Sequence, residues 1–172
     1  MELPGNGTHT SDCGKYQYIK WLELAPGEAK VCTILGLNPM NPEPGKPDQT
    51  AGICTEFAKR LGYTKLIFVN LFALVSRGTE GLPIGLEPVG ADNDRWIQEV
   101  AKVSHIIIGA WGDYPGIGPR VRTVMNALGA FDIYCVQANS NGSPRHPLAW
   151  RQKAPKLYRG AAGASTKIKG AS

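Results

Sequence analysis

The chain has 172 residues, a formal net charge of +5 and 42% hydrophobic residues, which suits one domain with its own core. No apolar run reaches the ~18 residues of a membrane-spanning helix, and we expect neither a signal peptide at residues 1–7 nor a membrane partner. The four cysteines are scattered without a CxxC pair, so we expect no zinc or iron–sulphur site, no other cofactor, and a reducing, cytoplasmic compartment. Cys32 and Cys135 lie in strand-like runs and are predicted to be buried thiols.

Basic residues gather at the C-terminal end. No acidic residue follows Asp132, whereas seven basic ones do: Arg145, Arg151, Lys153, Lys156, Arg159, Lys167 and Lys169. A one-signed segment of this kind suits a phosphate backbone, and a merely solubilising tail is the alternative. We divide the chain into a flexible N-terminus at 1–14, one domain at 15–150 and a basic tail at 151–172.

The first elements are two strands. Residues 16–24 alternate between apolar and polar, and the Pro-Gly turn at 25–28 leads into the apolar run 31–37. We expect the two strands to pair as a hairpin, with 16–24 at or near a sheet edge. The second strand stops at Asn38-Pro39, which places an amide at the end of a buried strand.

Helices and strands then alternate. Apolar spacing predicts helices from Gln49 or Thr50 to Leu61, from an Asp92 N-cap to Val103, and over 121–128. Apolar runs predict strands at 65–73, 105–111 and 133–138, and the apolar pattern fades after Leu148. The segments 39–48 and 75–90 are Gly/Pro-rich loops. The fold class is therefore α/β: a three-layer αβα domain with a mainly parallel central sheet, preceded by an N-terminal β-hairpin.

Polar or aromatic residues follow four different strands. Parallel strands end on one rim, so Asn38, Asn70, Trp111 and His146 should gather there, where α/β proteins bind ligands. Each has a simpler interpretation: Asn38 as a turn cap, Asn70 as a partner of backbone groups, Trp111 as core and His146 as a surface histidine. The chain contains no dinucleotide fingerprint, Walker loop, HExxH or GxSxG motif.

Four ordered motifs resemble the uracil-DNA glycosylase superfamily. They are Gly36-Leu-Asn-Pro39, Val69-Asn70, the strand ending in Trp111-Gly112 with Tyr114, and Arg145-His146-Pro147-Leu148. The chain resembles still more closely a family of uncharacterised bacterial and phage proteins that share the Leu-Asn-Pro and Arg-His-Pro-Leu motifs. Asn38 stands where the most active branch has aspartate, so the resemblance does not imply uracil as the substrate.

The resemblance implies a DNA glycosylase that hydrolyses the N-glycosidic bond of a flipped base. In that role Asn38 holds the water, Asp48 in the same loop is the candidate base, and His146 donates to the leaving base. Asn70 reads the base edge. The residues expected to stack on the base are Phe72, Trp111 and Tyr114, and those expected to hold phosphates are Arg145, Arg151 and Lys153.

The expected partner is DNA, through its backbone and one extruded base, with no obligate protein partner. A fitting role is removal of hypermodified pyrimidines, such as glucosylated hydroxymethylcytosine, from phage DNA. The alternatives are repair of deaminated or damaged bases, hydrolysis of free nucleosides or nucleotides, and binding of nucleotides or modified DNA without catalysis.

Overall fold

The computed structural model describes residues 1–39, 47–76, 87–151 and 153–159. These residues form one seven-stranded sheet in the order β1-β2-β4-β3-β5-β6-β7. The strands are β1 (Gly7–Thr10), β2 (Gln17–Glu23), β3 (Val31–Gly36), β4 (Lys65–Asn70), β5 (Ile106–Gly109), β6 (Ile133–Cys135) and β7 (Lys156–Arg159). The helices are α1 (Gln49–Arg60), α2 (Asn93–Val103), α3 (Gly118–Ala127) and the 3₁₀ turn η1 (Pro147–Ala149).

The centre of the sheet is parallel and its two edges are antiparallel. β4, β3, β5 and β6 run parallel, β2 and β1 add antiparallel strands at one edge, and β7 adds one at the other. β3 is buried from Val31 to Leu35, which explains its unbroken apolar run, since a central parallel strand is covered on both faces. The predicted α/β class with a largely parallel central sheet is therefore confirmed.

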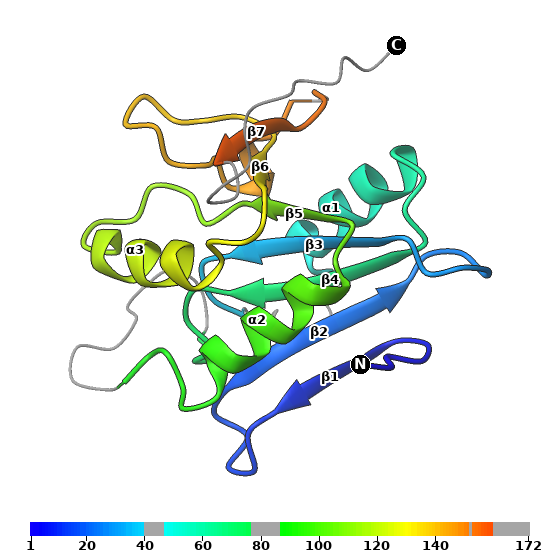
Figure 1. Cartoon of the computed structure of the whole chain (residues 1–172), viewed down its shortest axis with the longest axis horizontal. Helices are drawn as coiled ribbons and strands as arrows, with labels where there is room; N and C mark the ends of the chain where they lie inside the picture. The colour runs from blue at the N-terminus through cyan, green and yellow to red at the C-terminus, as the bar shows by residue number, and fades with distance from the viewer. Residues whose placement is uncertain (40–46, 77–86, 152, 160–172) are drawn as a thin grey trace.

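Helices cover both faces of the sheet (Figure 1). Alternate side chains of a strand point to opposite faces, so each central strand contributes to two cores. Even-numbered residues such as Ile34 and Ile108 pack with Phe57 of α1, whereas odd-numbered ones such as Leu35 and Ile107 pack in the cluster that includes α2 and α3. The result is the three-layer arrangement that the pattern predicted.

The predicted boundaries of α1 and α2 hold to within one residue, whereas α3 begins at Gly118, three residues before its predicted start. Asp48 caps α1, accepting a hydrogen bond from the backbone N–H of Ala51, and Gly62 follows the helix with φ of +75°. Asp92 is the N-cap residue of α2, but its side chain makes no capping hydrogen bond. Packing of the apolar face of α2 therefore counts for more than its cap.

Three details at the sheet edges differ from the sequence-based prediction. The strand at 16–24 pairs with β1 and β4 and not with β3, because β3 takes two parallel neighbours in the centre. The N-terminal hairpin is therefore β1–β2, built partly from residues expected to be flexible. β7 was not predicted either, because its residues Lys156–Arg159 show no apolar pattern. Edge pairing uses backbone groups and does not need one.

Other predictions fall partly outside the described residues. Residues 40–46 and 77–86 of the two Gly/Pro-rich loops are among these, as are 152 and 160–172 of the predicted tail. Within the described ranges, no helix is long and apolar enough to cross a membrane.

Candidate functional site

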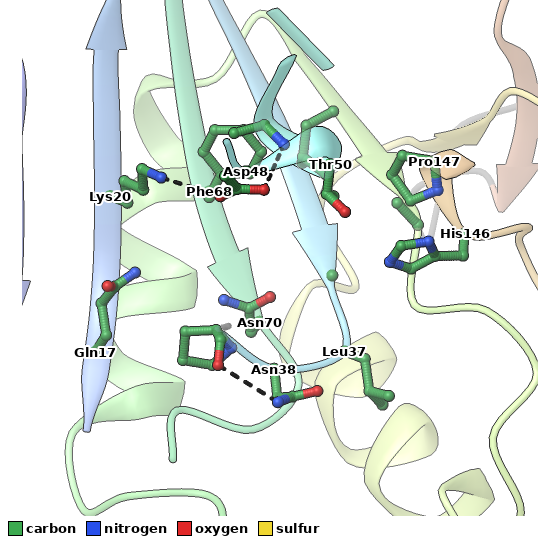
Figure 2. Close-up of a pocket in the computed structure, with 15 residues that line it drawn as sticks. Gln17, Lys20, Leu37, Asn38, Asp48, Thr50, Phe68, Asn70, His146 and Pro147 are labelled. Carbon is green, nitrogen blue, oxygen red and sulfur yellow. Dashed lines mark hydrogen bonds and ion pairs between the residues drawn. The ribbon is translucent and has the colours of Figure 1, made fainter. Parts of the chain in front are cut away.

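A cavity of about 100 Å³ opens at the carboxyl ends of the central strands, on the face covered by α1 (Figure 2). A buried water needs roughly 10–15 Å³, so the cavity has room for several waters or one small flat ring. Its walls come from β2, the ends of β3 and β4, the start of α1 and the start of η1. They include Gln17, Lys20, Ile34, Gly36, Asn38, Asp48, Thr50, Phe68, Asn70, Ala110 and His146.

The sheet register builds the floor. Lys20 pairs with Phe68, and Phe68 with Ile34, so these three side chains form one row on the α1 face. Towards the strand ends, Asn70 pairs with Gly36. The cavity forms where Gly36 offers no side chain, next to Ala110, which offers only a methyl group.

Asn70 is the most informative residue of the cavity. Its side chain lines the cavity and the residue is only 9% exposed, yet its amide makes no hydrogen bond to any residue in the described part of the chain. The two polar atoms of this amide are not among the fully buried side-chain atoms that lack a partner, so they reach the cavity, where a water or a ligand can bond them. A buried side chain that keeps one donor and one acceptor free toward a cavity is therefore set up for a ligand.

Gly36 is required by the position of Asn70. A Cβ at Gly36 would lie 2.6 Å from Asn70 Oδ1, a separation that real Cβ atoms do not adopt. The Gly in Gly36-Leu-Asn-Pro39 thus leaves space for the amide on the neighbouring strand, and the first and second motifs meet in one contact.

His146 enters the cavity from the opposite side (Figure 2). It precedes η1, and its Nδ1 accepts a hydrogen bond of 3.3 Å from the backbone N–H of Leu148. Burial lowers the pKa of His146 below its ordinary value, so the ring is neutral at pH 7. With Nδ1 accepting, the proton of the neutral ring lies on Nε2, which makes His146 a donor.

The loop after β5 supports this segment. Gly112 has φ of +78°, its N–H donates to the carbonyl of Pro144, and a Cβ on it would approach His146 Cβ to 3.5 Å. Gly112 therefore packs against His146, whereas Trp111 does not line the cavity.

Asp48 lines the cavity and has two partners. Its Oδ1 accepts from the N–H of Ala51 at 2.9 Å, and its Oδ2 lies 3.2 Å from Nζ of Lys20. A carboxylate can accept about four hydrogen bonds, so Asp48 can still accept one from a water. The positive end of the α1 macrodipole lies at the same place.

Asn38 lies at the edge of the cavity, and the NH₂ group of its side chain already donates hydrogen bonds to the protein. Its Nδ2 donates to Ser76 Oγ at 2.7 Å and, at 3.4 Å, to the carbonyl of Pro39. The turn-capping interpretation of Asn38 is thus supported for its NH₂ group. The carbonyl oxygen of its side chain has no hydrogen-bond donor among the described residues.

The three aromatic residues expected to stack on a base lie elsewhere. Phe72 and Trp111 are 8% and 2% exposed and pack in the core on the α2–α3 face, and Tyr114 lines a separate hollow with Trp111. The aromatic residue of the cavity is Phe68, which the sequence reasoning missed together with Lys20. Strand alternation contains the signal for Phe68, because Phe68 and Asn70 are two residues apart on β4 and share a face.

The predicted phosphate-binding residues differ in exposure. Arg151 and Lys153 are exposed, whereas Arg145 is half-buried and its Nε is buried without a hydrogen-bond acceptor among the described residues. None of the three lines the cavity.

Metal-ligating residues do not cluster in the described ranges, where no group of three or more His, Cys, Asp or Glu side chains could hold an ion. Cys32 and Cys135 are buried, as predicted, and burial raises the pKa of Cys32 to about 12, so its thiol is protonated and unreactive.

Comparison with known proteins gives one match. The family model described as "Protein of unknown function (DUF1643)" matches residues 18–148. The chain belongs to this family. The matched region runs from β2 to η1 and contains every residue that lines the cavity except Gln17. No curated protein and no solved structure matches the chain.

Proposed function

We propose that the cavity binds an extruded pyrimidine base and that the protein hydrolyses its N-glycosidic bond in DNA, leaving an abasic site. The observation that carries this proposal is the amide of Asn70, which has no hydrogen-bond partner among the described residues and lines a cavity that also contains an aromatic ring and a neutral histidine. An amide matches the adjacent donor and acceptor of a pyrimidine edge, and Phe68 offers a face to stack on.

Groups on the opposite wall of the cavity stabilise the charge that develops as the bond breaks. Breaking the bond leaves negative charge on the base and positive charge on the sugar. His146 donates from Nε2 to the base, and the N-terminus of α1 at Thr50 and Ala51 adds the positive end of a helix dipole. Both groups favour the departing anion over the bound base, as catalysis requires.

The remaining step needs a water. The side-chain carbonyl oxygen of Asn38 accepts a hydrogen bond from this water and holds it in place. The oxygen of the water bonds to C1′ of the sugar, and a proton of the water passes to the Asp48 carboxylate, while the C–N electron pair leaves with the base. This scheme agrees with the resemblance of the Gly36–Pro39, Asn70 and Arg145–Leu148 motifs to the uracil-DNA glycosylase superfamily. A hypermodified pyrimidine of phage DNA is the proposed substrate, with its ring in the cavity and its substituent outside the cavity's volume of about 100 Å³. A deaminated or damaged base, which carries no large substituent, is the repair alternative.

Binding without hydrolysis is the second candidate, and one observation favours it. Both oxygens of Asp48 and the NH₂ group of Asn38 already have protein partners. In a binding module these residues hold the loop and the start of α1, and Asn70 alone reads the base.

Phage DNAs that differ in base modification separate the two candidates. Each DNA is incubated with the protein and its abasic sites are labelled with an aldehyde-reactive probe. We expect label on at least one modified DNA, and its loss in Asn70→Ala and His146→Ala but not in Asn126→Ala, a matched control on the exposed side of α3. Binding to a modified DNA without label on any of them would refute hydrolysis and support the binding module.

A further inference from the structure

A second hollow lies beside the cavity, between α1 and the segment that contains η1. Thr50 and Ala51 of α1 line the cavity, and Gly52, Ile53 and Glu56 line the hollow. On the other wall, His146 and Pro147 line the cavity, and Trp150 and Arg151 line the hollow. We call this second hollow, about 810 Å³ in volume, the α1–η1 groove.

The groove has a cationic wall and an aromatic floor. Lys59, Arg60 and Arg151 line it, all three exposed, and its one acidic residue is Glu56, whose carboxylate lies 3.8 Å from Nζ of Lys59. The floor is the pair Phe57 and Trp150, with ring centroids 5.0 Å apart.

Two contacts hold the groove in shape. The guanidinium of Arg60 lies over Phe57, 5.7 Å from the ring centroid, and Nε1 of Trp150 donates to the carbonyl of Arg145 at 2.9 Å. The arginine charge is thereby placed on a packed surface. The hydrogen bond from Trp150 also connects the groove to Arg145, the residue just before His146 of the cavity.

We infer that the α1–η1 groove holds the DNA strand next to the nucleotide whose base enters the cavity, with phosphates at Lys59, Arg60 and Arg151. The inference rests on the proposed function for the identity of the strand, and on charge complementarity for the groove. From Thr50 to Arg60 the helix spans about 15 Å, the length of about four nucleotides at 3.4 Å each.

Salt-dependent binding of an unmodified single strand tests the groove without requiring catalysis. A fluorescein-labelled 12-nucleotide DNA is titrated with protein at several salt concentrations and its anisotropy is measured. The variant is Lys59→Ala/Arg60→Ala/Arg151→Ala. Its matched control is Arg95→Ala/Lys102→Ala/Arg122→Ala, which removes two exposed arginines and one lysine paired with an i−3 glutamate from the other face of the sheet.

Each lost phosphate contact should lower the slope of log K against log salt by about 0.7, so the groove variant should lose about 2. Over the decade from about 1 M to 0.1 M salt, that slope corresponds to roughly 100-fold weaker binding. The control should bind this DNA as the native protein does, because its three cations lie on the other face of the sheet.

Two results would overturn the inference. In one, the groove variant and its control lose the same affinity, which means that the charge acts over the whole surface. In the other, the native protein does not bind the oligonucleotide even at low salt. Neither result decides whether the protein releases a base, which the abasic-site assay measures separately. If no DNA is labelled in that assay but the groove variant loses strand binding as expected, the glycosylase proposal is refuted and the groove inference stands.

Discussion

Two asparagines, one at the end of β4 and one whose side chain bonds to the backbone there, allow a sharp test of the site. Asn70 faces the cavity without a hydrogen-bond partner among the described residues, whereas Asn93, 0% exposed at the start of α2, donates from Nδ2 to the carbonyls of Asn70 and Leu71 at 3.0 and 3.1 Å. We predict that alanine at each position gives opposite results: lost activity at 70 and lost stability at 93.

The magnitudes follow from these contacts. Asn70→Ala breaks no hydrogen bond to the described part of the chain, so the free energy of unfolding should change by less than about 1 kcal/mol. Its donor–acceptor contact with a base edge is worth about 1–3 kcal/mol, a loss of roughly 5- to 150-fold in kcat/KM. Asn93→Ala removes the amide donor to the carbonyls of Asn70 and Leu71, of which Leu71 keeps Nε of Arg120, and should cost about 1–3 kcal/mol. For a domain of this size that lowers the Tm by roughly 2–12 °C.

Two measurements decide the outcome. Calorimetry or circular dichroism gives the Tm of both variants, and the abasic-site assay gives their rates on a modified DNA below saturation. A large drop in Tm for Asn70→Ala would mean that the amide is structural. An unchanged rate in Asn70→Ala, with the native protein active, would mean that another group reads the base, and the central argument would be refuted.

Three further changes test the walls of the cavity. Gly36→Ala should push the Asn70 amide out of place and lower base release by about 100-fold, at a cost of about 1–3 kcal/mol in stability. Gly118→Ala, whose new Cβ would make only an ordinary contact of 3.6 Å with the guanidinium of Arg122, should leave the rate unchanged, and equal rates in both variants would contradict the role of Gly36. Asp48→Asn keeps an acceptor for the helix cap and should change stability by less than about 1 kcal/mol, while base release falls about 10²–10⁴-fold if the carboxylate takes the proton. A near-native rate, measured alongside urea unfolding, would make Asp48 a cap only. Burial lowers the pKa of His146, so the unfolded chain binds a proton that the folded chain does not, and stability should fall as pH drops from the ordinary value near 6.5 through the lowered pKa. Urea unfolding between pH 7 and 5 should show a weaker pH dependence in His146→Gln, and equal slopes in both proteins would contradict the buried, neutral ring.

The layers of the fold were predictable from local patterns. The apolar runs of β3 and β4 indicate strands covered on both faces, and the spacing of Ile53, Phe57 and Leu61 indicates α1. The edges were not predictable in this way. β1 and β7 join the sheet through backbone hydrogen bonds, which leave no mark on side-chain periodicity.

By itself, the sequence determined that Asn38, Asn70 and His146 would follow strand ends on one rim, because each comes after a buried run of a parallel sheet. Only the tertiary structure decided which of them face a shared cavity, since that depends on strand order and on the register between strands far apart in the chain. The register puts Lys20 beside Phe68, which shares the cavity face with Asn70 through the alternation along β4, whereas Trp111 packs on the other face. It also decides that Gly36 lies against Asn70, a contact between two strands that no local pattern can show.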